Sequence, residues 1–164
     1  MGLRRDGREA AVQYLFAHEL HEGTGKPTPE EIHAFWDLHS AKGGARKFAD
    51  ELTKGVLENL EAIDARISDA CINFHISRLA NVDRNILRLA VYELLHVPAL
   101  PAPIIITEAM EIAKKFGAPE SASFVNGVVD RIARDVRRGD PARRKSQPDP
   151  KADAADPPVN PVSA

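Results

Sequence analysis

The sequence predicts an all-α protein made of two packed small helical bundles, about seven helices in total, in front of a disordered C-terminal tail. Apolar residues recur every three or four positions through most of the chain, and no segment shows the sustained alternation of a β-strand. After Asp140 the chain contains no Leu, Ile, Phe, Tyr or Trp. With 164 residues, 43% of them hydrophobic, the chain can bury one real core.

Apolar stripes predict three helices in the first half of the chain. The first runs from Arg8 to near Gly23 and carries Val12, Leu15, Phe16 and Leu20. The next covers about 45–60, with Phe48, Leu52, Val56, Leu57 and Leu60 on its stripe. Another follows through Ile63, Ile67 and Ile72.

A capping signal predicts a short helix between the first two. Thr28 and Glu31 form a T-x-x-E capping box, and Pro29 suits the first helical position. This helix continues through Phe35, Trp36 and Leu38, and Gly43 with Gly44 is expected to end it.

The most apolar helix is predicted to begin at Asn81 as its N-cap. It is apolar on too many faces for a surface helix, which indicates the buried centre of the fold. Its apolar residues are Ile86, Leu87, Leu89, Ala90, Tyr92, Leu94 and Leu95.

Two further helices are expected after a proline-rich connector. Pro98, Pro101 and Pro103 interrupt the helical pattern, which resumes at Ile105 and stops at Gly117. The last helix opens at about 119–121 and fades at Gly139. Its apolar residues are Phe124, Val125, Val128, Val129, Ile132 and Val136.

These helices suggest a domain of residues 1–139, divided into subdomains of about 1–78 and 79–139. Residues 140–164 contain six prolines together with many alanines and charges. Such a segment cannot offset its ordering entropy by burial, so we expect it to be disordered.

Charge and cysteine content limit the class of protein. The formal net charge is -2, but basic residues gather at both ends of the chain, and local charge is what attracts phosphate. The basic residues are Arg4, Arg5 and Arg8 at the start and Arg131, Arg134, Arg137, Arg138, Arg143, Arg144 and Lys145 near the end. The single Cys71 and the lack of a secretion signal or membrane span predict a cytoplasmic protein.

Catalytic motifs are missing from the sequence. It has no glycine-rich phosphate loop, no nucleophile elbow and no H-E-x-x-H motif. His18 and His21 could share one helix face, but no spacing supplies a third metal ligand, and solvated histidines are the favoured interpretation. We therefore expect no enzyme activity and no cofactor or metal.

Three stretches resemble the NusB family. They are VDRNILRLAVYELL at 82–95, the P-x-x-x-x-E-A-x-E-x-A-K-K-F-G-A pattern at 103–118, and SASFVNGVVDRIAR at 121–134, in which F-V-N-G-V-x-D is the most specific string. The opening RRDGREAAVQYLFAHEL at 4–20 is also similar to that family. The resemblance covers most of residues 3–137, although 23–76 are only loosely diagnostic.

The resemblance implies a non-catalytic transcription antitermination factor with two helical subdomains. Such a protein binds boxA RNA of nascent transcripts, notably of ribosomal RNA operons, together with NusE, a small-subunit ribosomal protein. The pair then joins NusA, NusG and RNA polymerase. Monomer and homodimer both stay open, because family members occur in both forms.

The resemblance also implies two binding surfaces. Arginine binds phosphate and exposed phenylalanine rings stack on bases, so the RNA surface is expected to include charged, polar and aromatic positions. These are Arg4, Arg5, Arg8, Gln13, Phe116, Glu120, Ser123 and Phe124. The NusE surface is expected at Phe16, Asp83, Arg84 and Arg88, although Asp83 could also serve the helix dipole and Phe16 the core.

This chain departs from the family pattern at the RNA surface. Asp6 and Gly7 interrupt the arginine run, and Ser123 stands where a basic residue is more usual. Both changes predict weaker RNA binding without NusE. Asn126 and Gly127 are interpreted as packing residues, since a glycine inside a helix usually allows close helix contact.

Other interpretations remain. One is a NusB-like RNA-binding module of the sort fused to ribosomal RNA cytosine methyltransferases. Another is a helical adaptor that binds only protein, with which the interrupted arginine run is compatible. Salt-dependent RNA binding distinguishes the adaptor from the antitermination factor.

Overall fold

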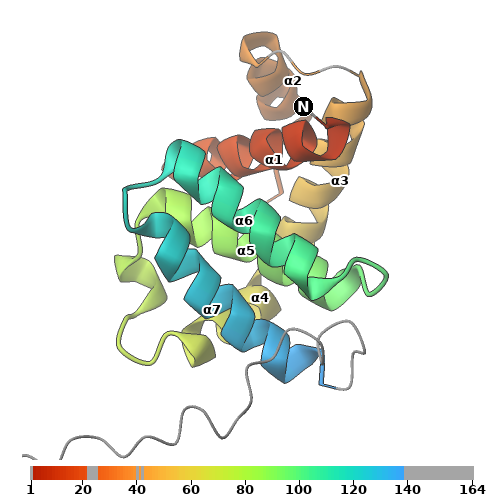
Figure 1. The fold of residues 1–164 in the computed structure, drawn as a ribbon. Coiled ribbons are helices and arrows are strands. Elements are labelled where there is room, and N and C mark those ends of the chain that lie inside the picture. Colours follow the sequence, from red (N-terminus) through yellow and green to blue (C-terminus); the bar gives the residue numbers. More distant parts are fainter. Residues whose placement is uncertain (1, 22–25, 40, 42, 139–164) are drawn as a thin grey trace, which may run out of the picture.

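The computed structural model describes residues 2–21, 26–39, 41 and 43–138. Within these ranges the chain is helical, with no strand, and the helices lie at several angles to one another (Figure 1). They are α1 (Leu3–Leu20), α2 (Pro29–Leu38), α3 (Gly43–Glu58), α4 (Leu60–Ala70), a 3₁₀ turn η1 (Ile76–Arg78), α5 (Asn81–His96), α6 (Ala102–Phe116) and α7 (Ser121–Val136). The predicted all-α class with seven α-helices is confirmed; the tail predicted at 140–164 lies outside the described residues.

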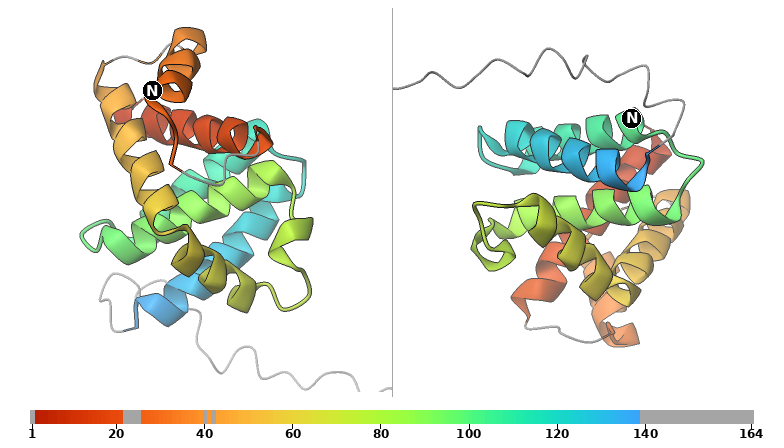
Figure 2. Two further views of the ribbon diagram at one scale, coloured as in Figure 1. Left: turned by 180° about the vertical axis from the view of Figure 1, so that it is seen from behind. Right: turned by 90° about the horizontal axis from the view of Figure 1, so that it is seen from below.

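The predicted central helix is confirmed as α5. Half of its sixteen residues are buried, and α1, α3, α4, α6 and α7 all pack against it. Two views at right angles show α6 and α7 side by side over one face of α5, with α3 on the opposite side (Figure 2). Ile86, Leu87 and Val91 are almost completely buried there.

The capping box of α2 is also confirmed. The Thr28 hydroxyl accepts a hydrogen bond from the Glu31 backbone N–H at 3.2 Å, and the Glu31 carboxylate accepts one from the Thr28 N–H at 2.9 Å. Each side chain satisfies a backbone donor at the start of the helix, where no carbonyl is available. Phe35 and Trp36 then bury the inner face of α2.

Three boundary predictions were wrong. Gly43 and Gly44 do not end α2, which stops at Leu38, but open α3, so the interruption in the pattern belongs to the next helix. Ile72 lies outside α4 and is 71% exposed, because the chain turns after Ala70.

Asn81 is the first residue of α5 and not its N-cap, which is Ala80. Its side-chain oxygen accepts a hydrogen bond from Asn85 Nδ2 at 2.6 Å. Asn81 therefore stabilises the first turn of α5 by accepting from the Asn85 side chain, and not by accepting from a backbone N–H as an N-cap residue would.

The buried apolar residues form one cluster that includes residues of every α-helix from α1 to α7. The division into subdomains at about residue 79 stays a prediction. No helix of the described chain is long and apolar enough to cross a membrane.

Candidate RNA-binding and protein-binding surfaces

The predicted RNA residues lie on three connected helices. α1 carries Arg4, Arg5, Arg8 and Gln13, and α6 ends with Phe116. Glu120 is the N-cap of α7, which carries Ser123 and Phe124 in its first turns. Two ion pairs join α1 to α6, Arg5 to Glu108 and Lys115 to Glu9, both at 2.8 Å. A four-residue connection then leads from α6 to α7. We call this region the α1–α6–α7 surface.

The three arginines of α1 have different environments. Arg4 is exposed, and its guanidinium lies 5.8 Å from the centre of the Phe48 ring. A cation over an aromatic face is held loosely and keeps its charge facing water. Arg4 is therefore the most accessible of the three cations.

Arg5 is paired with Glu108 through two hydrogen bonds, Nε to Oε2 at 3.0 Å and Nη2 to Oε1 at 2.8 Å. These bonds lower the pKa of Glu108, because they stabilise its charged form, and raise the pKa of Arg5 for the same reason. The Arg5 side chain remains one-third exposed, so a phosphate could compete with Glu108 for it.

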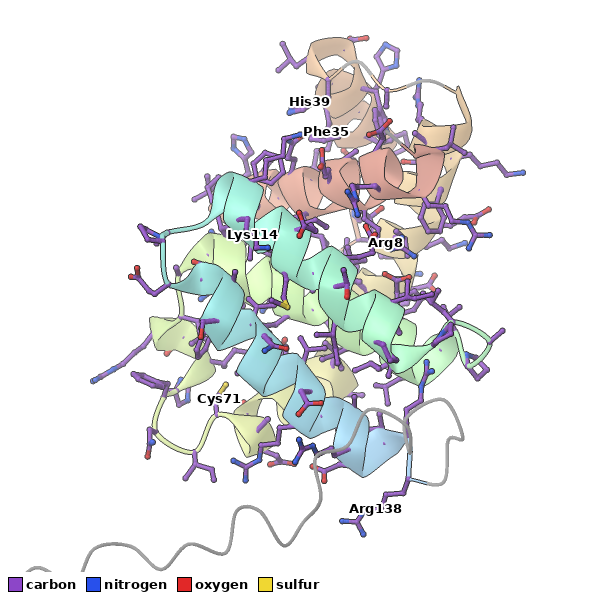
Figure 3. The ribbon with its side chains drawn as sticks, in the orientation of Figure 1. Arg8, Phe35, His39, Cys71, Lys114 and Arg138 are labelled. Atoms are coloured by element: carbon purple, nitrogen blue, oxygen red, sulfur yellow. The ribbon has the colours of Figure 1, made fainter. Side chains whose placement is uncertain are left out.

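Arg8 is 4% exposed, and its guanidinium is held by Glu93, which is 3% exposed. Nε donates to Oε1 at 2.8 Å and Nη2 to Oε2 at 2.9 Å. The Arg8 side chain, labelled in Figure 3, lies inside the protein and connects α1 to the central helix α5. In this arrangement Arg8 positions α1 and does not present its charge to solvent.

Gly7 has a packing role that the sequence did not reveal. A Cβ atom at this position would lie 2.7 Å from Phe48 Cδ1 and 3.1 Å from the Ala45 carbonyl oxygen. The glycine thus allows α1 to approach α3 closely. It interrupts the arginine run, but it also places the Phe48 ring beneath Arg4 and Arg8.

The two predicted stacking rings are partly buried. Phe116 and Phe124 both pack against the core at one edge. Lys115 Nζ lies 5.4 Å from the centre of the Phe116 ring, and Phe74 meets Phe124 edge to face, with ring centres 6.4 Å apart. Glu120 and Ser123 are exposed beside them, and Gln13 is partly exposed.

Sequence reasoning missed the lysines beside Phe116. Lys114 and Lys115 are exposed in the last turn of α6, and Figure 3 labels Lys114 next to this helix end. The K-K-F string contained the signal, because lysines that flank an aromatic residue can neutralise phosphates near a stacked base.

The predicted NusE residues lie around the start of α5. Arg88 binds Asp64 through Nε to Oδ1 at 2.9 Å and Nη2 to Oδ2 at 3.0 Å, and it also reaches Glu19 at 3.2 Å. Arg84 pairs with Glu19 and donates to the Ile76 and Leu79 carbonyl oxygens at 3.2 and 3.0 Å. Both arginines are thus engaged within the chain.

Phe16, Asp83, Arg84 and Arg88 are all partly exposed, but no ion pair among the described residues engages Phe16 or Asp83. Asp83 Oδ1 is buried and accepts no hydrogen bond from any described residue. A buried carboxylate oxygen without a donor costs free energy, and no described residue offsets that cost at Asp83 Oδ1.

The packing role expected for Gly127 is wrong. Both Asn126 and Gly127 are exposed, and a Cβ on Gly127 would meet nothing within 4 Å. Close helix packing occurs instead at Gly55, where a Cβ would lie 2.2 Å from Tyr92 Cζ.

His18 lies on α1, and His21 follows this helix as its C-cap. Among the residues that the structure describes, no group of three His, Cys, Asp or Glu side chains could hold a metal ion. His18 stacks on Tyr14 with ring centres 6.1 Å apart, and both line a hollow of about 400 Å³ between α1 and α2 together with His21, Phe35 and His39.

Comparisons with known proteins agree on one family. Residues 5–134 match the model of the NusB family. A transcription antitermination protein NusB from Sorangium cellulosum is 45% identical over 140 residues, which cover 85% of this chain and 98% of that protein. Its counterpart from Citrifermentans bemidjiense is 45% identical over 141 residues, covering 83% of this chain and 97% of that protein.

Solved structures share the fold. T. maritima NusB superposes with a TM-score of 0.70 at 38% identity and covers 80% of this chain and 90% of its own. A chain in the crystal structure of antitermination factors NusB and NusE in complex with dsRNA has a TM-score of 0.71 at 25% identity, covering 82% of this chain and 98% of that one. From these matches over most of its length, the chain belongs to the NusB family.

Proposed function

We propose that this protein is a transcription antitermination factor that binds the boxA segment of nascent ribosomal RNA transcripts together with NusE. In this role it would join NusA, NusG and RNA polymerase in the cytoplasm, without catalysing a reaction. Membership of the NusB family supports the proposal, as does the solved complex of a relative with NusE and RNA.

The observation that carries the proposal is the composition of the α1–α6–α7 surface. Arg4, Lys114 and Lys115 are exposed cations, and Phe116 and Phe124 are partly exposed rings on the same set of helices. Cations bind phosphates without regard to sequence, while rings hold unstacked bases of single-stranded RNA. Glu120 and Ser123 would add polar contacts to base edges.

Arg5 and Arg8 take different parts in this proposal. Arg5 would exchange Glu108 for a phosphate, because its pair is partly exposed to solvent. Arg8 would hold α1 against α5 through its ion pair with Glu93. Gln13, two turns along α1 from Arg5, would contact the RNA where α1 approaches the end of α6.

The NusE surface is proposed around Phe16 and Asp83. Arg84 and Arg88 would support this surface without contacting NusE, because Glu19 and Asp64 already bind them. The network connects α1, α4 and α5, so it fixes α1 and α5, which carry the two proposed contact residues, relative to each other.

The test is a titration of fluorescent boxA RNA and a scrambled RNA at low and moderate salt, with and without NusE. The expected result is that NusE strengthens binding to boxA RNA but not to the scrambled RNA. Phe116→Ala and Phe124→Ala should each weaken binding in proportion to a lost stacked base, about 1–3 kcal/mol. Arg4→Ala should reduce the salt dependence of the RNA affinity by an amount equal to about one phosphate contact.

The matched control is Arg66→Ala, which removes an exposed arginine from α4, away from these helices. It should leave RNA binding unchanged. If no RNA binds in any mixture while NusE still forms a complex, the protein is an adaptor and the RNA proposal is wrong.

A further inference from the structure

We propose that the RNA surface extends past Phe124 to a second aromatic platform on the connection between α4 and α5, where Phe74 stacks a further base and Arg131 of α7 binds its phosphate. We call Phe74, Phe124 and Arg131 the connector patch. The inference rests on the RNA-binding role proposed above and adds residues to it.

The first observation is the exposure of Phe74. This ring is 57% exposed, whereas Phe35 and Phe124 are buried or partly buried. A large apolar ring in water is unfavourable for the free protein by roughly 25 cal/mol for each Å² of apolar surface left uncovered. Ile72, 71% exposed, lies two residues before it, so the connection carries a second exposed apolar side chain.

The second observation is the fixed orientation of the Phe74 ring. It meets Phe124 edge to face, with an angle of 88° between the ring planes. This geometry is favourable for aromatic pairs and limits rotation of both rings. Two rings at right angles offer two faces for neighbouring bases, and an oriented ring loses little entropy when a base stacks on it.

The third observation is a cation without an acidic partner. Arg131 lies seven residues after Phe124, about two helical turns and about 10 Å along α7, and therefore on the same face. It is exposed and has no ion pair among the described residues, whereas Arg134 pairs with Asp130 at 2.9 Å. Burial raises the pKa of Cys71 at the start of the connection, and the nearby charge of Arg131 opposes that shift; Cys71 lies beside α7 in Figure 3.

Gly127 makes this face accessible. It lies between Phe124 and Arg131 on the exposed side of α7, and open space surrounds the position of a Cβ atom. A helical glycine without a packing contact leaves room for a ligand to approach the backbone. His75 and Arg78, both exposed on the connection, add donors near the rings.

These features favour RNA over a protein partner. An apolar ring without nearby charge would suit either, but a single-stranded nucleotide needs a ring for its base and a cation for its phosphate within about one nucleotide's reach. Phe74, Phe124 and Arg131 supply these groups. The patch also continues from Phe124, which already belongs to the α1–α6–α7 surface.

The test uses the full chain with NusE and boxA RNA extended at either end by unpaired nucleotides that carry 2-aminopurine. Stacking on Phe74 should change the fluorescence of the probe base at one extension. Phe74→Ala should abolish that change and weaken binding of the extended RNA about fivefold to 100-fold, with much less effect on the short boxA RNA. Phe74→Tyr, which keeps the ring, should restore both.

Arg131→Ala should lower the salt dependence of the affinity for the extended RNA by an amount equal to about one phosphate contact. Leu38→Ala is the matched control for loss of an exposed apolar side chain, because Leu38 is 84% exposed on α2. It should change neither signal. Circular dichroism of each variant checks that its fold is intact.

The outcomes separate this inference from the proposed function. If the wild type binds boxA RNA and Phe124→Ala weakens it, but Phe74→Ala binds every RNA normally, the connector patch is not part of the RNA site. If Phe74→Ala loses NusE and not RNA, the patch is a protein-binding surface and the inference is wrong. If wild type binds no RNA, both proposals fail.

Discussion

Arg8 and Glu93 form a bidentate ion pair inside the protein, between the first helix and the central one. Because both side chains are almost fully buried, each charge depends on the other for its stability. The pair fixes α1 against α5, and α1 carries the exposed Arg4 and the partly exposed Arg5 at the edge of the RNA surface.

Replacing Arg8 should therefore affect stability before it affects RNA. Arg8→Met leaves Glu93 buried without a partner, and we expect a loss of about 3–5 kcal/mol in the free energy of unfolding. Urea unfolding followed by circular dichroism measures this loss. Arg4→Ala is the control, since its side chain is exposed, and its unfolding free energy should change by less than about 0.5 kcal/mol.

The double variant Arg8→Met with Glu93→Leu identifies the cause. Removal of both charges should recover much of the stability that the single variant loses. If Arg8→Met unfolds like the wild type but loses RNA, then Arg8 is a direct phosphate contact and the buried pair is unimportant.

Removal of Glu108's charge should strengthen RNA binding. Glu108 holds Arg5 at 2.8 Å, and a phosphate must compete with it. In Glu108→Gln the arginine keeps a weaker, neutral partner, so the affinity for boxA RNA should rise and its salt dependence should steepen by up to about one contact. The same substitution combined with Arg5→Ala should give no gain, because no cation is then released.

The Arg5–Glu108 pair should also make stability depend on pH. Arg5 lowers the pKa of Glu108, so the pair stabilises the folded protein above the ordinary glutamate pKa of about 4.3. That contribution is lost as the pH falls through the lower folded-state pKa. Thermal unfolding of the wild type and Arg5→Ala should therefore differ near neutral pH and converge in acid; a constant difference would contradict the pairing.

Tyr14 should ionise late in an alkaline titration. Burial raises its pKa to about 12, with Glu31 and Asp50 adding to the shift. In the unfolded chain the phenol ionises near its ordinary value of about 10, so between these two values rising pH favours unfolding. The difference in ultraviolet absorbance between wild type and Tyr14→Phe isolates this group, and an ionisation near the ordinary value would show that Tyr14 is not buried.

The sequence predicted the fold well because the helical signals were local. The T-x-x-E box at Thr28 and the apolar faces of the central helix each depend on residues within a few turns. Helix ends were harder to predict, since Gly43 and Gly44 suit the start of a helix as well as the end of one.

The candidate sites could be predicted only as residue types. The sequence grouped Arg4, Arg5 and Arg8 as equal cations, but their environments depend on Phe48, Glu108 and Glu93, which lie 44, 103 and 85 residues away. Ion pairs over such separations have no local signal. The same reason explains why Phe74 was missed: only the fold brings it against Phe124.

Substitution of Gly127 should change the stability of the free protein and its RNA binding in different ways. A glycine inside a helix is less favourable than alanine by about 0.5–1 kcal/mol, and no neighbour would obstruct a Cβ here. Gly127→Ala should therefore stabilise the free protein, whereas Gly55→Ala, whose Cβ would collide with Tyr92, should destabilise it. If Gly127→Ala raises the unfolding free energy yet weakens binding of the extended RNA, the open backbone on α7 serves the ligand; if it lowers stability, the helix packs there in a way that contradicts this structure.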